Sequence, residues 1–368
     1  MYAAEVRSAS LLFFREFVMK KNLVIIGYGG IGSGLHCKNA LQSDVVSLKG
    51  IYDIDPAKSA LAEERGIHAY ASLEEVLSDA DIDLVTVAIP NDSHKDVVVK
   101  SLLAGKHVIC EKPVALSSED LDEMIAASKK SGKLFTVHQN RRFDVDYLAI
   151  QKLVDENTVG APLRIESRIH GSRGIPSDWR GTKAQGGGMI LDWGVHLIDQ
   201  LLLIFKGLTI TEIYCEVTNI TNKEVDDGCY LTMTFENGAK AMVEVGTYNF
   251  IPLPRFYMKA ENGTALISDW REEAQVVRCK YWHESDVVPV ETAAGLTKTM
   301  APRDSITVDE FRVARPTSDV HDFYRNFCAA IDGTCGQMVT HTEMRRVVRV
   351  MEEAFRSADL KEVLKVNI

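Results

Sequence analysis

The sequence feature that most constrains the fold is the set of glycines at Gly27, Gly29 and Gly32, which directly follows the apolar residues 23–26. A short apolar run of this kind is typical of a buried parallel strand. After such a strand, Gly27 permits a tight turn, Gly29 lets backbone approach a pyrophosphate, and Gly32 lets the next helix pack closely. The unpaired N–H groups at the start of that helix favour a bound phosphate. The pattern therefore predicts a dinucleotide-binding βαβ unit.

The second strand of this unit, residues 48–53, ends in an acidic residue. Asp53 lies 21 residues after Gly32, which is the spacing of the carboxylate that binds the adenosine ribose. A carboxylate there repels the 2′-phosphate of NADP, and Asp55 adds a second negative charge, while Lys58 is the nearest cation. The sequence predicts NAD rather than NADP as the cofactor. The candidate cofactor-binding residues are Gly27, Gly29, Gly30, Ile31, Gly32, Asp53, Pro90, Asn91, His94, Glu111 and Lys112.

Strand and helix patterns alternate along the chain to about residue 140. Residues 83–89, 107–110 and 134–138 have strand patterns, and residues 93–104 and 118–130 have helical ones. Alternation of this kind predicts a doubly wound parallel sheet, a Rossmann domain, in an α/β protein. Ligands of such sheets bind at the carboxyl ends of the strands.

The pattern changes after about residue 160. Turns rather than helices separate most of the expected strands, at residues 164–170, 213–219, 230–236, 239–248 and 256–260. We therefore expect a C-terminal α+β domain with a large, mostly antiparallel open sheet. Two closing helices are predicted at residues 318–331 and 342–358.

Length and composition support two domains and exclude several classes of protein. The 368 residues exceed one ordinary core. We expect an N-terminal extension over residues 1–18 that lacks the features of a signal peptide. A Rossmann domain is expected over residues 19–140, and a substrate-binding and oligomerisation domain over residues 141–368. The last helices of the second domain are free to pack back on the first domain. The net charge of -10 argues against nucleic acid, and we expect no membrane span. Seven scattered cysteines without a C-x-x-C pair predict reduced thiols and a cytoplasmic location.

Candidate catalytic residues follow the glycines at 186–188. His196 is the candidate base, because the ordinary pKa of imidazole lies near neutrality. Asp192 precedes it by four residues, and on a helix over residues 189–205 both would face one side, so that Asp192 could orient the imidazole or bind a substrate hydroxyl. Lys112, at the end of a strand, could stabilise a developing alkoxide. The plainer alternatives are an exposed Asp/His pair on a helix and an exposed lysine at a strand end.

Other polar residues are candidates for binding the substrate. Asn140 and Arg141 lie at a strand end, and Trp179 and Arg180 lie in the expected loop over residues 171–188, which is either a pocket cover or an ordinary surface loop. Asp192 and His196 complete the candidate substrate-binding set. Asp192, His196 and Glu111 are residue types that bind zinc, but they form no tight ligand cluster in sequence and hydride transfer needs no metal, so no zinc site is predicted.

Several motifs together resemble one family. The chain is similar to the glucose-fructose oxidoreductase and inositol dehydrogenase (Gfo/Idh/MocA) family from residue 19 to its end. The motifs that carry the resemblance are residues 27–32, 90–94, 111–113, 139–144, 186–196 and 322–327. The resemblance implies the same two domains, a cis peptide before Pro113, catalytic importance for Lys112, Asp192 and His196, and an open sheet whose outer face makes a homodimer or homotetramer.

These observations predict an enzyme: an NAD(P)-dependent dehydrogenase acting on CH–OH groups. It would move a hydride between a secondary hydroxyl of a sugar, cyclitol or related polyol and the nicotinamide. Two alternatives stay open. One is a non-catalytic sugar or nucleotide sensor, and the other is an NAD-dependent glycosidase of the same fold that oxidises its sugar transiently.

Overall fold

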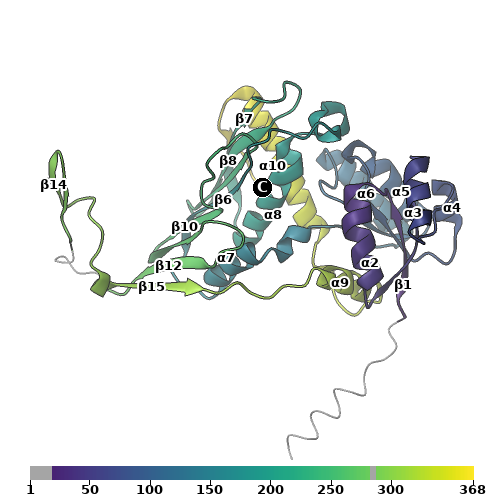
Figure 1. Ribbon diagram of the computed structural model, residues 1–368, viewed down its shortest axis with the longest axis horizontal. Coiled ribbons are helices and arrows are strands. Elements are labelled where there is room, and N and C mark those ends of the chain that lie inside the picture. The colour runs from purple at the N-terminus through teal and green to yellow at the C-terminus, as the bar shows by residue number, and fades with distance from the viewer. Residues whose placement is uncertain (1–18, 282–286) are drawn as a thin grey trace, which may run out of the picture.

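The computed structural model describes residues 19–281 and 287–368, so the predicted extension at residues 1–18 lies outside the described part. Two bodies lie side by side in Figure 1. The first contains a small sheet covered by helices, and the second contains a large sheet with helices on one face only. The predicted α/β fold class is confirmed.

The first sheet is fully parallel, as predicted, and its strand order is β2-β1-β3-β4-β5. Its strands are β1 (Lys21–Ile26), β2 (Val46–Tyr52), β3 (Leu84–Val87), β4 (His107–Cys110) and β5 (Phe135–Val137). The connecting helices are α2 (Cys37–Gln42), α3 (Pro56–Glu64), α4 (Leu73–Ser78), α5 (His94–Leu103) and α6 (Ser118–Ser131). The strand order reverses beside β1, which places the glycine loop at the switch point where dinucleotides bind.

Short polar residues begin several of these helices, because their side chains accept hydrogen bonds from unpaired backbone N–H groups. Asp55 caps α3, Ser72 caps α4 and Ser117 caps α6. Gly132 ends α6 with φ 69°, a left-handed conformation that glycine adopts without strain. These caps fix where each helix begins, and therefore where the strand-end loops lie.

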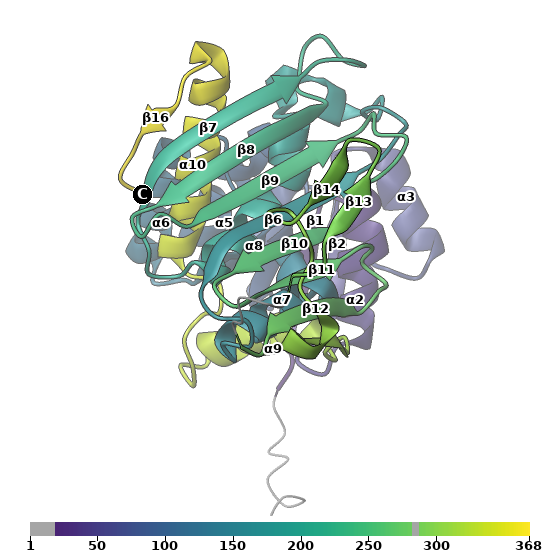
Figure 2. The same ribbon diagram turned by 90° about the vertical axis from the view of Figure 1, so that its left-hand side faces the viewer.

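The second sheet is mixed and open, with the order β15-β12-β11-β10-β6-β9-β8-β7-β16 (Figure 2). The β6–β9 pair is parallel and the other pairs are antiparallel. Its strands are β6 (Pro162–His170), β7 (Ile210–Thr218), β8 (Gly228–Phe235), β9 (Lys240–Gly246), β10 (Phe256–Ala260), β11 (Gly263–Ile267), β12 (Ala274–Cys279), β15 (Val308–Val313) and β16 (Leu364–Lys365). A separate hairpin of β13 (Val290–Thr292) and β14 (Gly295–Thr297) projects away from the body (Figure 1).

One face of the large sheet is covered by helices. These are α7 (Val145–Asp155), α8 (Val195–Ile204) and α10 (His341–Leu360), and α10 also contacts α6 of the first domain. Residues 183–204 are apolar and long enough to pass a compositional test for a membrane-spanning helix, but 78% of the tested window is buried inside the fold. A core helix of a folded domain has the same composition, so this segment is explained by packing.

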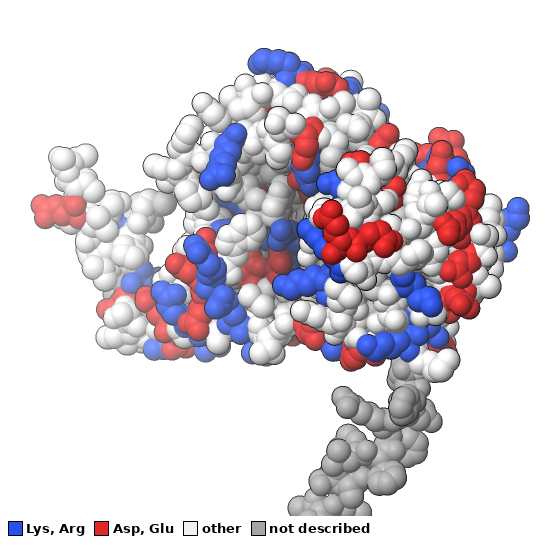
Figure 3. All heavy atoms as spheres, turned by 45° about the vertical axis from the view of Figure 1, so that its right-hand side comes forward, with Lys and Arg blue, Asp and Glu red and all other residues white. Residues whose placement is uncertain are grey.

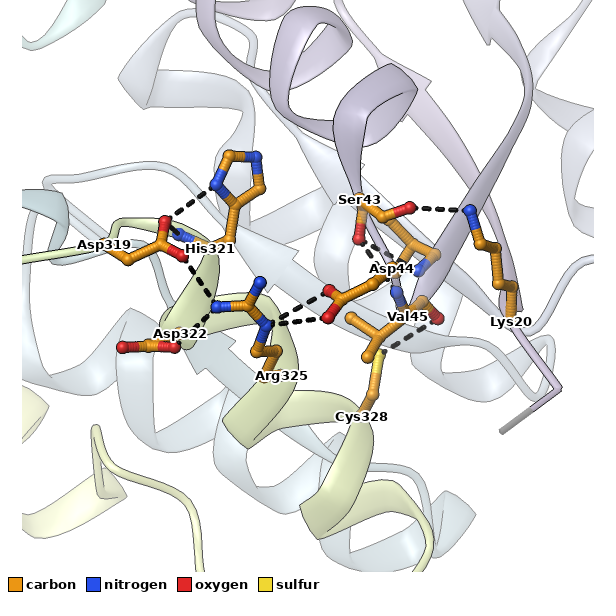
Figure 4. A network of polar contacts seen from close by, with 10 residues as sticks. Lys20, Ser43, Asp44, Val45, Asp319, His321, Asp322, Arg325 and Cys328 are labelled. Atoms are coloured by element: carbon orange, nitrogen blue, oxygen red, sulfur yellow. Dashed lines mark hydrogen bonds and ion pairs between the residues drawn. The ribbon is translucent and has the colours of Figure 1, made fainter. Parts of the chain in front are cut away.

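The late helix α9 (His321–Ile331) packs against the first domain. Figure 4 shows Arg325 in contact with Asp44, Asp319 and Asp322, while the Cys328 thiol donates to the Val45 carbonyl. These ion pairs are exposed, so each contributes little stability. Buried contacts matter more, because Phe323, Tyr324 and Phe327 of α9 are all buried in the core. Helix α9 thus lies against the domain that contains the glycine loop.

The structure corrects one prediction that matters for the site. The expected α-helix over residues 189–205 begins as a π-helical turn, Ile190–Gly194, and becomes α8 only at Val195. A π turn is wider than an α turn, so residues four apart no longer lie directly above each other. Strands β11, β12 and β15 were not expected either, because their short segments carry no clear alternation.

Candidate active site

A cleft of about 810 Å³ runs along the carboxyl ends of the first sheet's strands. Figure 3 shows the hollow between the two domains, with basic and acidic side chains on its walls. Its walls are contributed by the loops that follow β2, β1, β3 and β4, and by a segment of the second domain. The candidate residues that line it are Gly27, Gly29, Gly30, Ile31, Asp53, Pro90, Asn91, Glu111, Lys112, Trp179, Arg180 and Asp192.

The glycine loop has the shape that a dinucleotide requires. Gly27 has φ 98°, and a Cβ there would lie 2.2 Å from the Ala88 carbonyl oxygen. A Cβ on Gly32 would lie 1.9 Å from the Gly27 carbonyl oxygen, so Gly32 lets the helix pack closely although it does not line the cleft. Beside Gly29 and Gly30 there is open space within 4 Å, which is where a pyrophosphate must approach backbone. The residues present therefore fit an NAD-type cofactor.

Asp53 contributes to the loop as well as to the cleft. Its Oδ2 accepts a hydrogen bond from the Tyr28 N–H at 2.6 Å, and its Oδ1 accepts one from the Asp55 N–H at 2.8 Å. Each carboxylate oxygen keeps a lone pair for a ribose hydroxyl. Among the described residues that line the cleft, the cations are Lys112 and Arg180, and both lie at its other end.

That other end is built around a charged triplet. The Lys112 Nζ donates to the Asp192 carbonyl oxygen at 2.7 Å and to its Oδ1 at 3.0 Å, and the Arg180 Nε donates to its Oδ2 at 3.2 Å. These two cations hold the pKa of the Asp192 carboxyl below its ordinary value despite burial, which opposes ionisation. The cis peptide implied before Pro113 is present. Asp192 is therefore an anion that fixes the Lys112 ammonium in the cleft.

His196 lies behind this triplet, is not among the residues that line the cleft, and forms no hydrogen bond with the triplet. It is 3% exposed, and its Nδ1 has no partner among the described residues. Its ring packs edge-on against Trp193, with ring centroids 6.1 Å apart. Burial, and then the positive charge of Lys112, lower the pKa of His196 well below its ordinary value. The imidazole is therefore neutral at pH 7. Asp192 bonds Lys112 and Arg180 instead of His196, so it does not orient the imidazole, which was one of its two predicted roles.

The start of the π-helical turn is held by a buried acid. The Asp226 Oδ2 accepts the Ile190 N–H at 2.8 Å, and its carbonyl oxygen accepts the Met189 N–H at 3.0 Å. A Cβ on Gly188 would lie 2.2 Å from the Asp226 Oδ1, and Gly188 has φ 108°, so glycine is required there. Burial raises the pKa of Asp226 to about 6. This contact fixes the turn that presents Asp192.

Glu111 is buried next to Lys112, at the wall of the cleft. Its Oε1 accepts from His36 Nε2 at 2.7 Å and from His138 Nδ1 at 2.8 Å, and its Oε2 accepts from the Lys112 N–H at 3.1 Å. His36 Nδ1 in turn lies 2.6 Å from the Tyr324 hydroxyl of α9. The His36, Glu111 and His138 ligand atoms lie within 4.8 Å of one another, close enough to hold a metal ion, although hydrogen bonds already account for them.

Some predicted binding residues lie behind the cleft wall. His94 is fully buried, with Nδ1 2.9 Å from the Pro113 carbonyl oxygen and Nε2 3.0 Å from that of Ile89. Asn91 lines the cleft and donates to the Gly186 carbonyl, which ties the two domains together. Asn140 and Arg141 are not among the lining residues. The structure therefore places His94 behind the cleft wall, with both ring nitrogens within hydrogen-bond distance of backbone carbonyls.

Arg141 belongs to an aromatic cluster next to His196. Its guanidinium carbon lies 4.1 Å from the centroid of Trp193 and 5.7 Å from that of Trp270, within the range of cation–π contacts. Its Nη1 pairs with Asp144 at 3.0 Å. Sequence reasoning missed Trp193, Trp270, His36 and Tyr324. Trp193 could have been found from its place between Asp192 and His196, but the others are far away in sequence.

The fold and the cleft define an NAD(P)-binding oxidoreductase, and comparison with known proteins gives its family. Residues 21–139 match the NAD-binding Rossmann-fold domain of the oxidoreductase family GFO_IDH_MocA, and residues 147–266 match the C-terminal domain of that family. The chain belongs to the Gfo/Idh/MocA family, as the motifs predicted.

Relatives agree on the fold and differ in activity. An NAD-binding protein from Listeria innocua, known from its crystal structure, is 41% identical in sequence to this chain. The two structures superpose with a TM-score of 0.91, over 94% of this chain and 99% of the Listeria chain. The scyllo-inositol 2-dehydrogenase (NADP(+)) IolW of Bacillus subtilis is 26% identical over 97% of this chain and 99% of its own. The 1,5-anhydro-D-fructose reductase of Ensifer adhaerens is 31% identical over 50% of this chain and 56% of its own. Several other curated relatives are matched over 38% to 67% of their length.

Proposed function

We propose that the protein is an NAD-dependent dehydrogenase that moves a hydride between a secondary hydroxyl of a sugar, cyclitol or related polyol and the nicotinamide. The observation that carries the proposal is the Lys112 ammonium, which Asp192 fixes at the end of the cleft opposite Asp53. The inositol dehydrogenases and the sugar reductase among the relatives support the substrate class.

Each residue of the site has a distinct task in this proposal. The bound cofactor supplies the hydride acceptor. Lys112 donates a hydrogen bond to the reacting oxygen and stabilises its alkoxide character, while neutral His196 accepts the hydroxyl proton. Asp192 holds the Lys112 side chain in place through two hydrogen bonds.

The preference for NAD rests on Asp53. The 2′-phosphate of NADP would meet this carboxylate, and no lysine or arginine of the described cleft wall lies near it to compensate. IolW uses NADP, so members of the family differ in this respect.

A substrate panel tests the proposed function. The purified protein is incubated with NAD or NADP and a set of sugars, inositols and sugar alcohols, and nicotinamide reduction is followed by absorbance. We expect turnover with NAD on at least one polyol, and loss of that turnover in His196→Ala. A protein that binds a polyol but reduces no cofactor would support the sensor instead, and release of an aglycone without net reduction would support the glycosidase.

We also propose that the protein is a cytoplasmic homodimer or homotetramer, assembled through the outer face of the large sheet. The seven cysteines are unpaired, which fits a reducing compartment. The helices cover one face of the sheet and leave the other without a covering layer in Figure 2, as a symmetric interface requires. Light scattering at micromolar concentration should give a dimer or tetramer, and a monomer would contradict this proposal.

A further inference from the structure

The hairpin of β13 and β14 belongs to a segment, residues 287–300, that holds its apolar side chains in solvent; we call this segment the arm. Every residue of the arm except Thr297 is exposed. Its large apolar side chains are Val287, Val288, Val290, Leu296 and Met300, and Leu296 is 71% exposed. Its charged residues are Glu291 and Lys298, one of each sign. An apolar surface without net charge is suited to contact with another protein surface rather than with a polyanion.

The arm has little to hold it in place within one chain. Each strand of its hairpin has three residues, which pair from Val290 with Thr297 to Thr292 with Gly295. The two strands form a sheet of their own, apart from the large sheet. A two-stranded hairpin of this length is marginally stable in water unless its apolar side chains are covered. No part of the chain within residues 19–281 and 301–368 provides such a cover, since these side chains are exposed.

The arm stands on the same side of the molecule as the uncovered face of the large sheet. In Figure 1 the helices α7, α8 and α10 lie on one side of that sheet, and the arm projects on the other side. Figure 2 looks at the uncovered face, and the hairpin lies in front of it. The arm therefore projects past the face on which a second protein surface could dock.

The side chains of β6 show which residues this uncovered face presents. Arg255 donates to the Ser167 hydroxyl of β6 and to the Gln200 side chain of α8, so Ser167 points toward the helices. Successive residues of a strand point to opposite faces of a sheet. Glu166 and Arg168 therefore point to the uncovered face.

The charges on this face are paired with one another. Arg168 forms ion pairs with Glu166 and, at 2.8 Å, with Glu244 of the neighbouring strand β9. Tyr230, which lies opposite Glu244 in the register of β8 and β9, is 45% exposed. Covering a set of paired charges leaves none of them without a partner, and exposed tyrosines are frequent in protein interfaces. The face is thus suited to being covered by protein.

We propose that the arm clasps a second copy of this chain that is docked on the uncovered face of the large sheet. In a two-fold assembly each copy presents the same face and the same arm, so an arm that projects past one face meets the body of the other copy. Leu296 and Met300 become buried in that contact, and each arm holds its partner. The inference rests on the proposed assembly through the outer face of the sheet.

The first experiment measures the dissociation constant of the assembly by sedimentation equilibrium. Leu296→Asp places a charge on a side chain that is exposed in the single chain, so the fold should be unaffected. We expect the dissociation constant to rise about 10- to 100-fold, because two arms per two-fold contact each lose a buried leucine. An unchanged constant would overturn the proposal.

Leu41→Asp is the matched control. Leu41 lies on α2 of the first domain and is 65% exposed, so the same change of charge is made on a similar side chain away from the large sheet. The dissociation constant should stay near that of the wild type. An equal rise in both variants would mean that added charge, rather than loss of the arm contact, weakens the assembly, and would overturn the proposal.

A second experiment shows what the arm touches. The photo-reactive residue p-benzoylphenylalanine replaces Leu296, and unlabelled and isotope-labelled chains are mixed until native mass spectrometry detects mixed assemblies. After irradiation, we expect cross-linked peptides that join a labelled chain to an unlabelled one. Cross-links found only within chains of one label would mean that the arm lies on its own chain, and would overturn the proposal.

The remaining outcomes separate this inference from the proposals on which it depends. An assembly that persists in Leu296→Asp, together with binding of the wild-type protein to phosphatidylcholine vesicles that this variant loses, would assign the arm to a lipid surface and overturn the inference alone. A monomeric wild-type protein would overturn the proposed assembly and this inference together. The dehydrogenase reaction is tested separately, by the substrate panel.

Discussion

The two ends of the cleft differ in the groups that form them. The adenosine end consists of backbone from the loop at residues 27–32 and of Asp53, which accepts the Tyr28 N–H. The reacting end consists of side chains from two segments that are distant in sequence, one with Lys112 and the other with Arg180 and Asp192, and these three residues are in contact. The first end comes from one βαβ unit, whereas the second exists only where the two domains meet.

Because of this difference, we expect one set of residues to determine the affinity for the cofactor and another set to determine the rate of the reaction. Backbone N–H groups and a single carboxylate bind the cofactor in the same way before and during the reaction, so they set its dissociation constant. Charged groups at the reacting oxygen act where charge develops, so they set the rate. We therefore expect substitutions at the reacting end to lower turnover without loss of cofactor, and substitutions at the adenosine end to do the reverse.

The largest effect that we expect in this comparison is that of Lys112→Ala. Removing the donor to the developing alkoxide should lower turnover by about 10²–10³-fold. Steady-state kinetics on the polyol found by the panel, combined with an NAD titration, measure both quantities. If NAD affinity fell as much as turnover, the separation between the two ends would be wrong.

Asp53→Ala tests the other end. Loss of the carboxylate should narrow the preference for NAD over NADP by about 1–3 kcal/mol, the value expected for a charged hydrogen bond. Calorimetry with both cofactors measures the change, and turnover at saturating NAD should stay near that of the wild type. Tighter binding of NADP than of NAD by the unaltered protein would contradict the cofactor assignment.

A smaller effect concerns the buried Asp226 that holds the turn before Asp192. Its folded pKa of about 6 lies above its ordinary value of 3.8, so the folded state favours the protonated form. The contribution of Asp226 to stability is therefore fully present below about pH 3.8 and is lost as the pH rises through about 6. Asp226→Asn keeps an acceptor without the charge, so it should stabilise the protein by about 1–3 kcal/mol at pH 8.

Denaturant unfolding at pH 8 and near pH 4 measures this dependence on pH. The gain in Asp226→Asn should shrink toward pH 4, and an equal gain at both values would contradict the assignment. Asp227→Asn is the matched control, because hydrogen bonds from Thr218 and Thr221 lower the pKa of Asp227 despite burial. That variant should destabilise the protein at pH 8.

Sequence reasoning succeeded where the structure depends on local patterns. Strands β4 (His107–Cys110) and β10 (Phe256–Ala260) were predicted with the observed bounds, because apolar runs between turn signals mark buried strands. The glycine loop and Asp53 were found from their spacing within one βαβ unit. The parallel sheet followed from the alternation of strands and helices.

The reacting end was only partly predictable. Lys112 and Asp192 were identified, but their direct contact joins residues 80 positions apart, and only the packing of the two domains creates it. The π-helical turn has no recognised signal in a sequence that is helical by composition. Tyr324 reaches His36 across 288 positions, a contact that no local period encodes. Such contacts depend on tertiary structure alone.

The central claim is that the reacting end sets the rate and the adenosine end sets the affinity for the cofactor. The most direct test is to measure both kcat and the NAD dissociation constant of His196→Ala on one preparation. His196 is buried, neutral and free of hydrogen bonds to the described residues at its Nδ1, so its removal should spare the fold and the cofactor. We predict that kcat falls by about 10²–10⁴-fold while the dissociation constant is nearly unchanged. Turnover that survives the substitution, or cofactor binding that is lost with it, would contradict the account.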